Sequence, residues 1–133
     1  MPNENAERFT YARDAERRIV RVTTRDVITA DDLVAVIDRQ REEGSWSFGV
    51  LYDMRRLEGP MSKEDTMTVA NHVRQSVSEH GPRGPVALVT RKSNLVGAGL
   101  VYAHDIKRSA EIEVFWDVRE AEEWLAKRLQ QQP

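Results

Sequence analysis

Pro85-Val86-Ala87-Leu88-Val89-Thr90-Arg91 is the stretch that decides the fold class of this 133-residue chain. Its apolar run is short and continuous, with a proline before it and a charged residue after it. A run without alternation is typical of a strand that is covered on both faces, as in the middle of a parallel sheet. We therefore expect helices on both sides of a sheet.

Four further segments are predicted to be strands of the same sheet. Phe9–Asp14 and Ile19–Thr24 alternate apolar and polar residues across a polar turn, which indicates a hairpin with one solvated face. Val50–Asp53 and Glu111–Phe115 complete the set. The first, second and last of these strands are expected near the sheet edges, or with one face in solvent, because their apolar residues alternate.

Helix start signals lie between these strands. Thr29, Ser62, Ser93 and Asp117 carry side-chain oxygens that can cap the first backbone amides of a helix. The second helix is expected to end at Gly81-Pro82. Its predicted buried stripe is Met67, Ala70, Val73 and Val77.

The resulting element order is β-β-α-β-α-β-α-β-α. Strands that alternate with helices require right-handed crossovers, so the order predicts a mainly parallel five-stranded sheet with an antiparallel N-terminal strand. We expect one α/β domain over residues 1–133, with an ordered core from about residue 9 to about residue 129.

The composition excludes several classes of function. Twenty basic against twenty-two acidic side chains argue against a nucleic-acid surface, and the lack of cysteine excludes disulfides and thiolate metal sites. No apolar run approaches the length of a membrane span, and Met1–Arg8 lacks the apolar region of a secretory signal. The expected location is the cytoplasm.

No pattern of catalytic residues is present, so the sequence predicts no enzyme, no cofactor and no metal. His72 and His80 are eight residues apart, which is too far for a paired metal site, and His104 stands alone. Gly97-Ala98-Gly99 lacks the third glycine of a dinucleotide turn. Asp53 is the one carboxylate that we would test first for an enzymatic role.

Cations follow the third and fourth predicted strands. Arg55 and Arg56 follow the third strand. Arg91 and Lys92 follow the fourth, and Ser93 comes next as the expected start of a helix. The carboxyl ends of parallel strands meet at one edge of a sheet, where helix starts also attract anions. This rim is a candidate site for a phosphate or an acidic peptide, and ordinary solvated loop charges are the alternative.

Three stretches resemble the STAS superfamily, in particular its SpoIIAA-like branch. They are Phe48–Arg55, Gly84–Val89 and Ile112–Leu125, and the resemblance extends over nearly the whole chain. In the sporulation anti-sigma-factor antagonists of this superfamily, a partner kinase phosphorylates a serine in an Asp-Ser-Ser-Gly motif. The matching position is Ser62, in Gly59-Pro60-Met61-Ser62, where that motif is missing.

The resemblance implies a non-catalytic regulatory module that binds a protein partner or itself, with a homodimer as one form. Related folds include the CRAL-TRIO lipid carriers. The alternative function is therefore binding of a small ligand, an anion or a lipid, at the rim beyond the third and fourth strands or in an apolar pocket beneath the helices.

Overall fold

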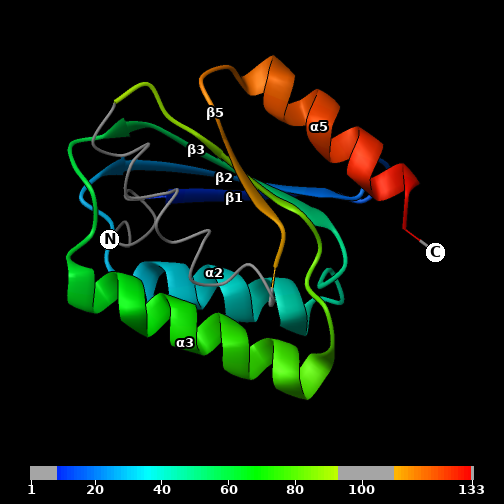
Figure 1. Ribbon diagram of the computed structural model, residues 1–133, viewed down its shortest axis with the longest axis horizontal. Coiled ribbons are helices and arrows are strands. Elements are labelled where there is room, and N and C mark those ends of the chain that lie inside the picture. The colour runs from blue at the N-terminus through cyan, green and yellow to red at the C-terminus, as the bar shows by residue number, and fades with distance from the viewer. Residues whose placement is uncertain (1–8, 93–109, 133) are drawn as a thin grey trace, which may run out of the picture.

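The computed structural model describes residues 9–92 and 110–132, which form a sheet between two layers of helices (Figure 1). The strand order is β1-β2-β3-β4-β5, with β1 antiparallel to β2 and the other neighbours parallel. This confirms the predicted mixed, mainly parallel five-stranded sheet. The elements are β1 (Phe9–Asp14), β2 (Ile19–Asp26), α2 (Ala30–Glu42), β3 (Gly49–Leu57), α3 (Lys63–His80), β4 (Val86–Val89), β5 (Ile112–Phe115) and α5 (Val118–Gln130).

The two faces of the sheet are covered by different helices. Helices α2 and α3 lie on one face, and α5 lies on the other (Figure 1). All four residues of β4 are buried, with Val86 and Leu88 toward α2 and α3, and Ala87 and Val89 toward α5. The continuous apolar run that decided the fold class is thus a strand covered on both faces, as predicted.

Two separate hydrophobic cores result from this arrangement. The larger core packs β2, β3 and β4 against both α2 and α3. The smaller core packs the opposite sides of the same strands against α5 alone. Its buried members are Ile19, Leu51, Ala87, Val89, Ala121, Leu125 and Leu129.

Three of the four predicted helix caps, Thr29, Ser62 and Asp117, are found in the structure. Thr29 and Asp32 form a reciprocal capping box at the start of α2, which satisfies two of its free backbone donors. The Ser62 hydroxyl accepts from the amide of Asp65 at the start of α3. Gly81 ends α3 with a φ of 88°, a conformation that a side chain disfavours.

Two strands extend further than predicted. β2 continues to Asp26 and β3 continues to Leu57, because the pair remains hydrogen-bonded beyond its buried part. Arg25 lies beside Arg56 in that polar extension, where no apolar pattern marks a strand. The helix expected to begin at Ser93 lies outside the described residues.

The predicted buried stripe of α3 was wrong at one position. Met67 is 55% exposed, whereas Val69 is 2% exposed and takes its place in the core. The buried residues of α3 are Val69, Ala70, Val73 and Ser76. Because Ala70 and Val73 are buried as predicted, the core-facing stripe of α3 is shifted toward Val69 and away from Met67, and the helix as a whole keeps the predicted orientation.

Candidate functional site

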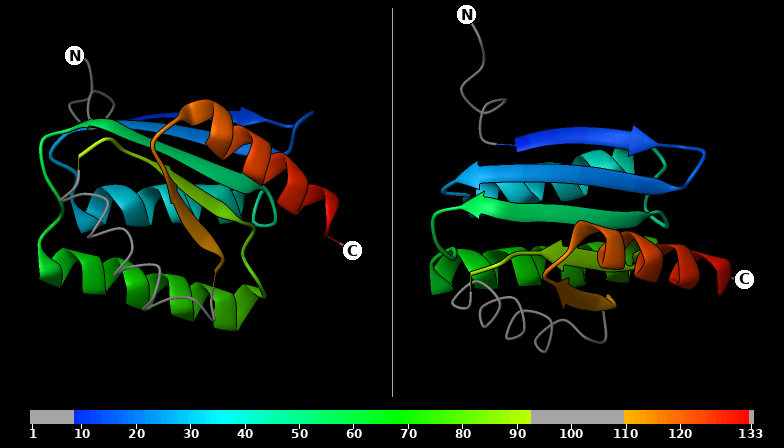
Figure 2. Two further views of the ribbon diagram at one scale, coloured as in Figure 1. Left: turned by 45° about the horizontal axis from the view of Figure 1, so that its top comes forward. Right: turned by 90° about the horizontal axis from the view of Figure 1, so that it is seen from above.

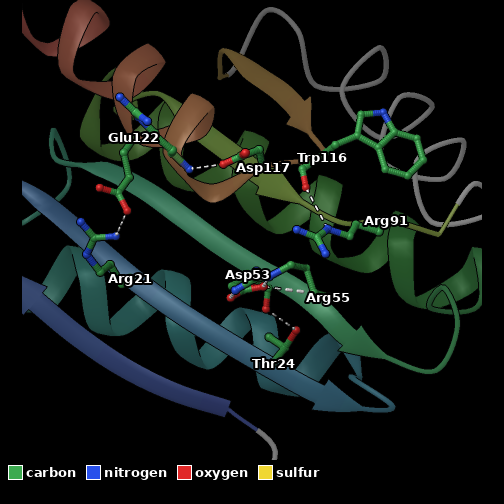
Figure 3. Close-up of polar contacts among 9 residues, drawn as sticks. Arg21, Thr24, Asp53, Arg55, Arg91, Trp116, Asp117 and Glu122 are labelled. Carbon is green, nitrogen blue, oxygen red and sulfur yellow. Dashed lines mark hydrogen bonds and ion pairs between the residues drawn. The ribbon is translucent and has the colours of Figure 1, made fainter.

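The rim at the carboxyl ends of β3 and β4 is largely occupied by contacts within the protein. Arg55 forms a bidentate pair with Asp53, with Nε–Oδ1 at 2.9 Å and Nη2–Oδ2 at 2.7 Å (Figure 3). These hydrogen bonds hold the pKa of Asp53 below its ordinary value. Asp53 is therefore a permanently charged partner of Arg55 at neutral pH.

The cations that follow β4 also bind neighbouring backbone. Lys92 Nζ donates to the carbonyls of Leu57 and Glu58, and so ties the end of β3 to the end of β4. Arg91 Nε donates to the carbonyl of Trp116 at 3.4 Å (Figure 3). Arg56 is exposed, and Ser93 lies outside the described residues. Within the described part of the rim, most of the positive charge already has a partner.

Ser62 lies at an exposed helix start. Its hydroxyl accepts from the amide of Asp65 at 3.0 Å, and its carbonyl accepts from Thr66. The structure therefore gives Ser62 a structural role as the cap of α3, with its side chain accessible to solvent.

The two described histidines, His72 and His80, have separate partners. His72 Nε2 lies 2.7 Å from Asp38 Oδ1 and links α3 to α2. His80 Nε2 lies 3.7 Å from the carboxylate of its neighbour Glu79, and His104 falls outside the described residues. Residues 9–92 and 110–132 contain no cluster of side chains able to hold a metal ion. None of the helices described is long and apolar enough to cross a membrane.

A cavity of about 80 Å³ lies between the sheet and helices α2 and α3. Its wall is predominantly apolar and comes from both helices, from β3, β4 and β5, and from the segments that join them. The lining residues are Ile28, Leu33, Ile37, Tyr52, Met54, Leu57, Pro60, Met61, Thr66, Val69, Arg83, Val86, Leu88, Thr90, Ile112 and Val114.

One charged side chain contributes to this wall. Arg83 lies between α3 and β4 and is only 7% exposed. Its Nε and Nη2 donate to Gln40 Oε1 at 3.2 and 3.0 Å, and Nη2 also donates to the Tyr52 hydroxyl at 3.2 Å. The guanidinium thus has neutral hydrogen-bond partners in the interior of the protein.

An apolar pocket beneath the helices was one of the two places considered for a ligand, but sequence reasoning missed Arg83 in its wall. The available signal was a single arginine in Gly81-Pro82-Arg83-Gly84-Pro85, a turn-forming segment directly before the strand predicted to be most buried. A long charged side chain in such a connection is usually solvated, and only the three-dimensional packing turns it inward.

The comparisons with known proteins bear on the fold. The sequence matches no protein-family model and no curated protein. A solved structure is similar: that of an uncharacterized protein of the DUF3478 family from Shewanella loihica PV-4, described as having a SpoIIAA-like fold. The two chains are 18% identical, the TM-score is 0.57, and the match covers 88% of this chain and 91% of that one. The topology and this match together show that the chain has a SpoIIAA-like fold.

Proposed function

We propose that this protein is a non-catalytic module that binds a small, largely apolar ligand in the cavity between the sheet and helices α2 and α3. The observation that carries the proposal is the cavity itself, about 80 Å³ beside the larger core, with a wall of buried and partly buried apolar residues. The cavity supports a ligand site beneath the helices in preference to the cationic rim, where internal contacts already engage Arg55, Arg91 and Lys92.

The energetics of packing favour an occupant. Protein interiors are close-packed, and atoms that line a void lack dispersion contacts on one side. A ligand restores those contacts and is selected by size. The volume is about half of the roughly 150 Å³ of an engineered cavity that binds benzene, so it suits a short branched chain or a comparably compact group.

The polar groups support a role without catalysis. A general base needs a pKa near the working pH, whereas the pKa of Asp53 is lowered by its pairing with Arg55. The His72 imidazole is committed to Asp38, away from the residues that line the cavity. Neither group is placed to move a proton on a ligand held in the cavity.

Two substitutions on α3 provide the test. Val69 lines the cavity, whereas Val73, one turn further along, is fully buried without lining it. Val69→Phe is expected to be tolerated because the ring enters empty volume, and Val73→Phe is expected to cost about 1–3 kcal/mol by overpacking. Xenon should perturb the methyl NMR signals of Leu33, Ile37 and Leu88 in the wild type and leave those signals unchanged in Val69→Phe.

The outcome that would contradict the proposal is equally clear. Equal destabilisation by both substitutions, with no effect of xenon on the cavity methyl groups, would mean that the core is closed. Val73→Phe also serves as a control for the probe, because it leaves the cavity wall intact and should retain the xenon shifts if it folds.

Binding of a protein partner or of a second copy is a second candidate function. The observation that favours it is Trp116, which is 55% exposed directly after the edge strand β5. Exposed tryptophans often supply much of the binding energy of an interface. Light scattering over a range of protein concentrations tests self-association, and Trp116→Ser should shift any oligomer toward monomer. A constant monomer mass in both proteins, with no partner retained on immobilised wild type, would remove this candidate.

A further inference from the structure

We infer that the ligand of this cavity is a compact monocarboxylate, with its charged group held by Arg83 and Tyr52 and its apolar group in the cavity. The inference rests on the proposed function, since it names the chemistry of the same ligand. Its basis is a buried guanidinium whose described partners are all neutral.

Arg83 is a buried cation that lacks an ionic partner among the described residues. A buried cation is costly unless an anion pairs with it. Arg83 is 7% exposed, and its contacts among the described residues are the Gln40 amide oxygen, the Tyr52 hydroxyl and the face of Trp46, 5.6 Å from the ring centroid. No described carboxylate forms an ion pair with it, so the positive charge is left for a ligand.

Arg83 and Tyr52 have hydrogen-bond donors that the contacts within the described residues do not use. An arginine has five N–H donors, and the observed contacts use those of Nε and Nη2. Nη1 makes no hydrogen bond within the described part of the chain. The Tyr52 hydroxyl accepts from Arg83, so its own hydrogen is available for donation. Both residues line the cavity, and together they offer donors that match the two oxygens of a carboxylate.

The supporting contacts hold these donors in place. Gln40 Nε2 donates to the carbonyl of Ser45 at 2.8 Å, which fixes the direction of the amide and turns its oxygen toward Arg83. Nearby, the Trp46 indole donates to the carbonyl of Gly81 at 2.9 Å. The site is therefore preorganised, which reduces the entropy lost when a ligand binds.

The apolar wall restricts the class of anion. The cavity residues close to β4 and β5 are aliphatic, so a second negative charge would have no partner among the described lining residues. A phosphate monoester carries up to two charges, whereas a carboxylate carries one and neutralises Arg83. A single water molecule in the cavity would satisfy the free donors without neutralising the charge.

Isobutyrate and isobutanol form a matched pair of probes, since they share a branched apolar group and differ in charge. Both are titrated into wild-type protein and followed by methyl NMR shifts and by thermal stability. We expect isobutyrate to bind about tenfold or more tightly than isobutanol, because hydrogen bonds to charged groups are the stronger ones. Isobutyl phosphate should bind more weakly than isobutyrate.

Variants identify the groups responsible. Tyr52→Phe removes only a hydroxyl and should reduce the affinity for isobutyrate about fivefold to tenfold, while leaving isobutanol unchanged. Arg83→Gln should abolish the preference for the anion. Arg56→Gln is the matched control, since it removes an exposed positive charge outside the cavity and should leave both affinities unchanged.

The possible outcomes separate this inference from the proposed function. If isobutanol and xenon bind in the cavity but isobutyrate has no advantage, the carboxylate inference is overturned and the cavity function stands. If none of these probes perturbs the cavity methyl groups, both fail. A preference for isobutyrate that survives unchanged in Tyr52→Phe and Arg83→Gln would also overturn the assignment to this pair.

Discussion

The two faces of the sheet are built from the same strands and yet differ in how they are filled. Of the helices that the structure describes, two cover the α2/α3 face, where the larger core leaves about 80 Å³ empty beside a buried arginine. A single helix covers the other face, where Ala121 and Leu125 are fully buried against Leu51, Ala87 and Val89. The space on the α5 face is an open groove of about 600 Å³ between β2 and α5, lined by charged side chains such as Arg21 and Glu122. The space beside α2 and α3 is smaller and has an apolar wall, so it is the one suited to an apolar ligand.

The α5 face is also the more open of the two. Helix α5 crosses the half of the sheet that contains β3, β4 and β5, and it leaves β1 and much of β2 uncovered (Figure 2). Polar side chains on this face pair with one another or with α5. Arg21 of β2 contacts Glu122 of α5, and Asp53 contacts Arg55 at the end of β3 (Figure 3). These two arginines have carboxylate partners, in contrast to Arg83 on the other face, whose described partners are neutral.

Truncation of a leucine on each face sharpens this comparison most. Leu125 is fully buried and lies so close to β3 that a Cβ on Gly49 would be 3.1 Å from its Cδ2. Leu125→Ala should cost about 4 kcal/mol in the free energy of unfolding. Leu33→Ala should cost only about 2–3 kcal/mol, because Leu33 already borders empty volume and has fewer contacts to lose.

Urea denaturation of both variants checks this prediction. The free energies of unfolding can be compared when their dependence on urea concentration has the same slope in both variants. Equal losses would mean that the two cores are equally well packed, and the contrast between the faces would disappear. A larger loss for Leu33→Ala would reverse the contrast.

The contrast between the faces also marks what the sequence could predict. The continuous apolar run of β4 gave the two-sided sheet, and the side-chain oxygens of Thr29 and Ser62 gave correct helix starts, because these signals are local. The choice between Met67 and Val69 at the edge of the buried stripe of α3 was not predictable, since both are apolar and only the packing of the helix decides which one is buried. The inward direction of Arg83 depends on Gln40 and Tyr52, which are distant in sequence.

Gly84→Ala tests how closely the backbone next to Arg83 packs against the backbone of Trp46 and Phe48. A Cβ at this position would lie 2.1 Å from the carbonyl oxygen of Phe48, and the Gly84 amide donates to Trp46 at 3.0 Å. The segment around Gly84 and the segment that contains Trp46 and Phe48 must separate to admit the methyl group. We therefore expect the free energy of unfolding to fall by about 2–3 kcal/mol. Gly59→Ala is the control, because nothing lies within 4 Å of its Cβ, and it should be neutral or slightly stabilising. Similar melting temperatures for the two variants would contradict a close approach of the loops.

The contact between Arg21 and Glu122 tests whether ion pairs hold α5 over the open strip. The atoms are 3.0 Å apart and both side chains are about one-third exposed, so the coupling should be below about 1 kcal/mol. A double-mutant cycle with Arg21→Met and Glu122→Gln measures it, and 1 M salt should reduce it. The pair Arg119 and Glu123 within α5 is much more exposed and should couple by only about 0.3 kcal/mol. Equal coupling in the two pairs would show that the contact between β2 and α5 adds no specific stability.

A small single-residue effect is expected at Asp53, where it appears as a dependence on pH. Hydrogen bonds from Arg55 lower the pKa of Asp53 in the folded protein below its unfolded value of about 3.9. A carboxyl group with a lowered pKa stabilises the fold above the unfolded pKa, and this stabilisation is lost as the pH falls through the folded pKa. The pair is partly exposed and solvent screens it, so Asp53→Asn should cost only about 0.5 kcal/mol at pH 7.

Urea denaturation from pH 7 to pH 3 measures this difference in the free energy of unfolding between Asp53→Asn and wild type. The difference should be constant down to about pH 5 and should shrink below about pH 4. Arg55→Gln should lose the same pH dependence, because it removes the donor that lowers the pKa. A difference that persists unchanged at pH 3 would mean that the role of Asp53 is steric, and that the α5 face does not depend on this charge.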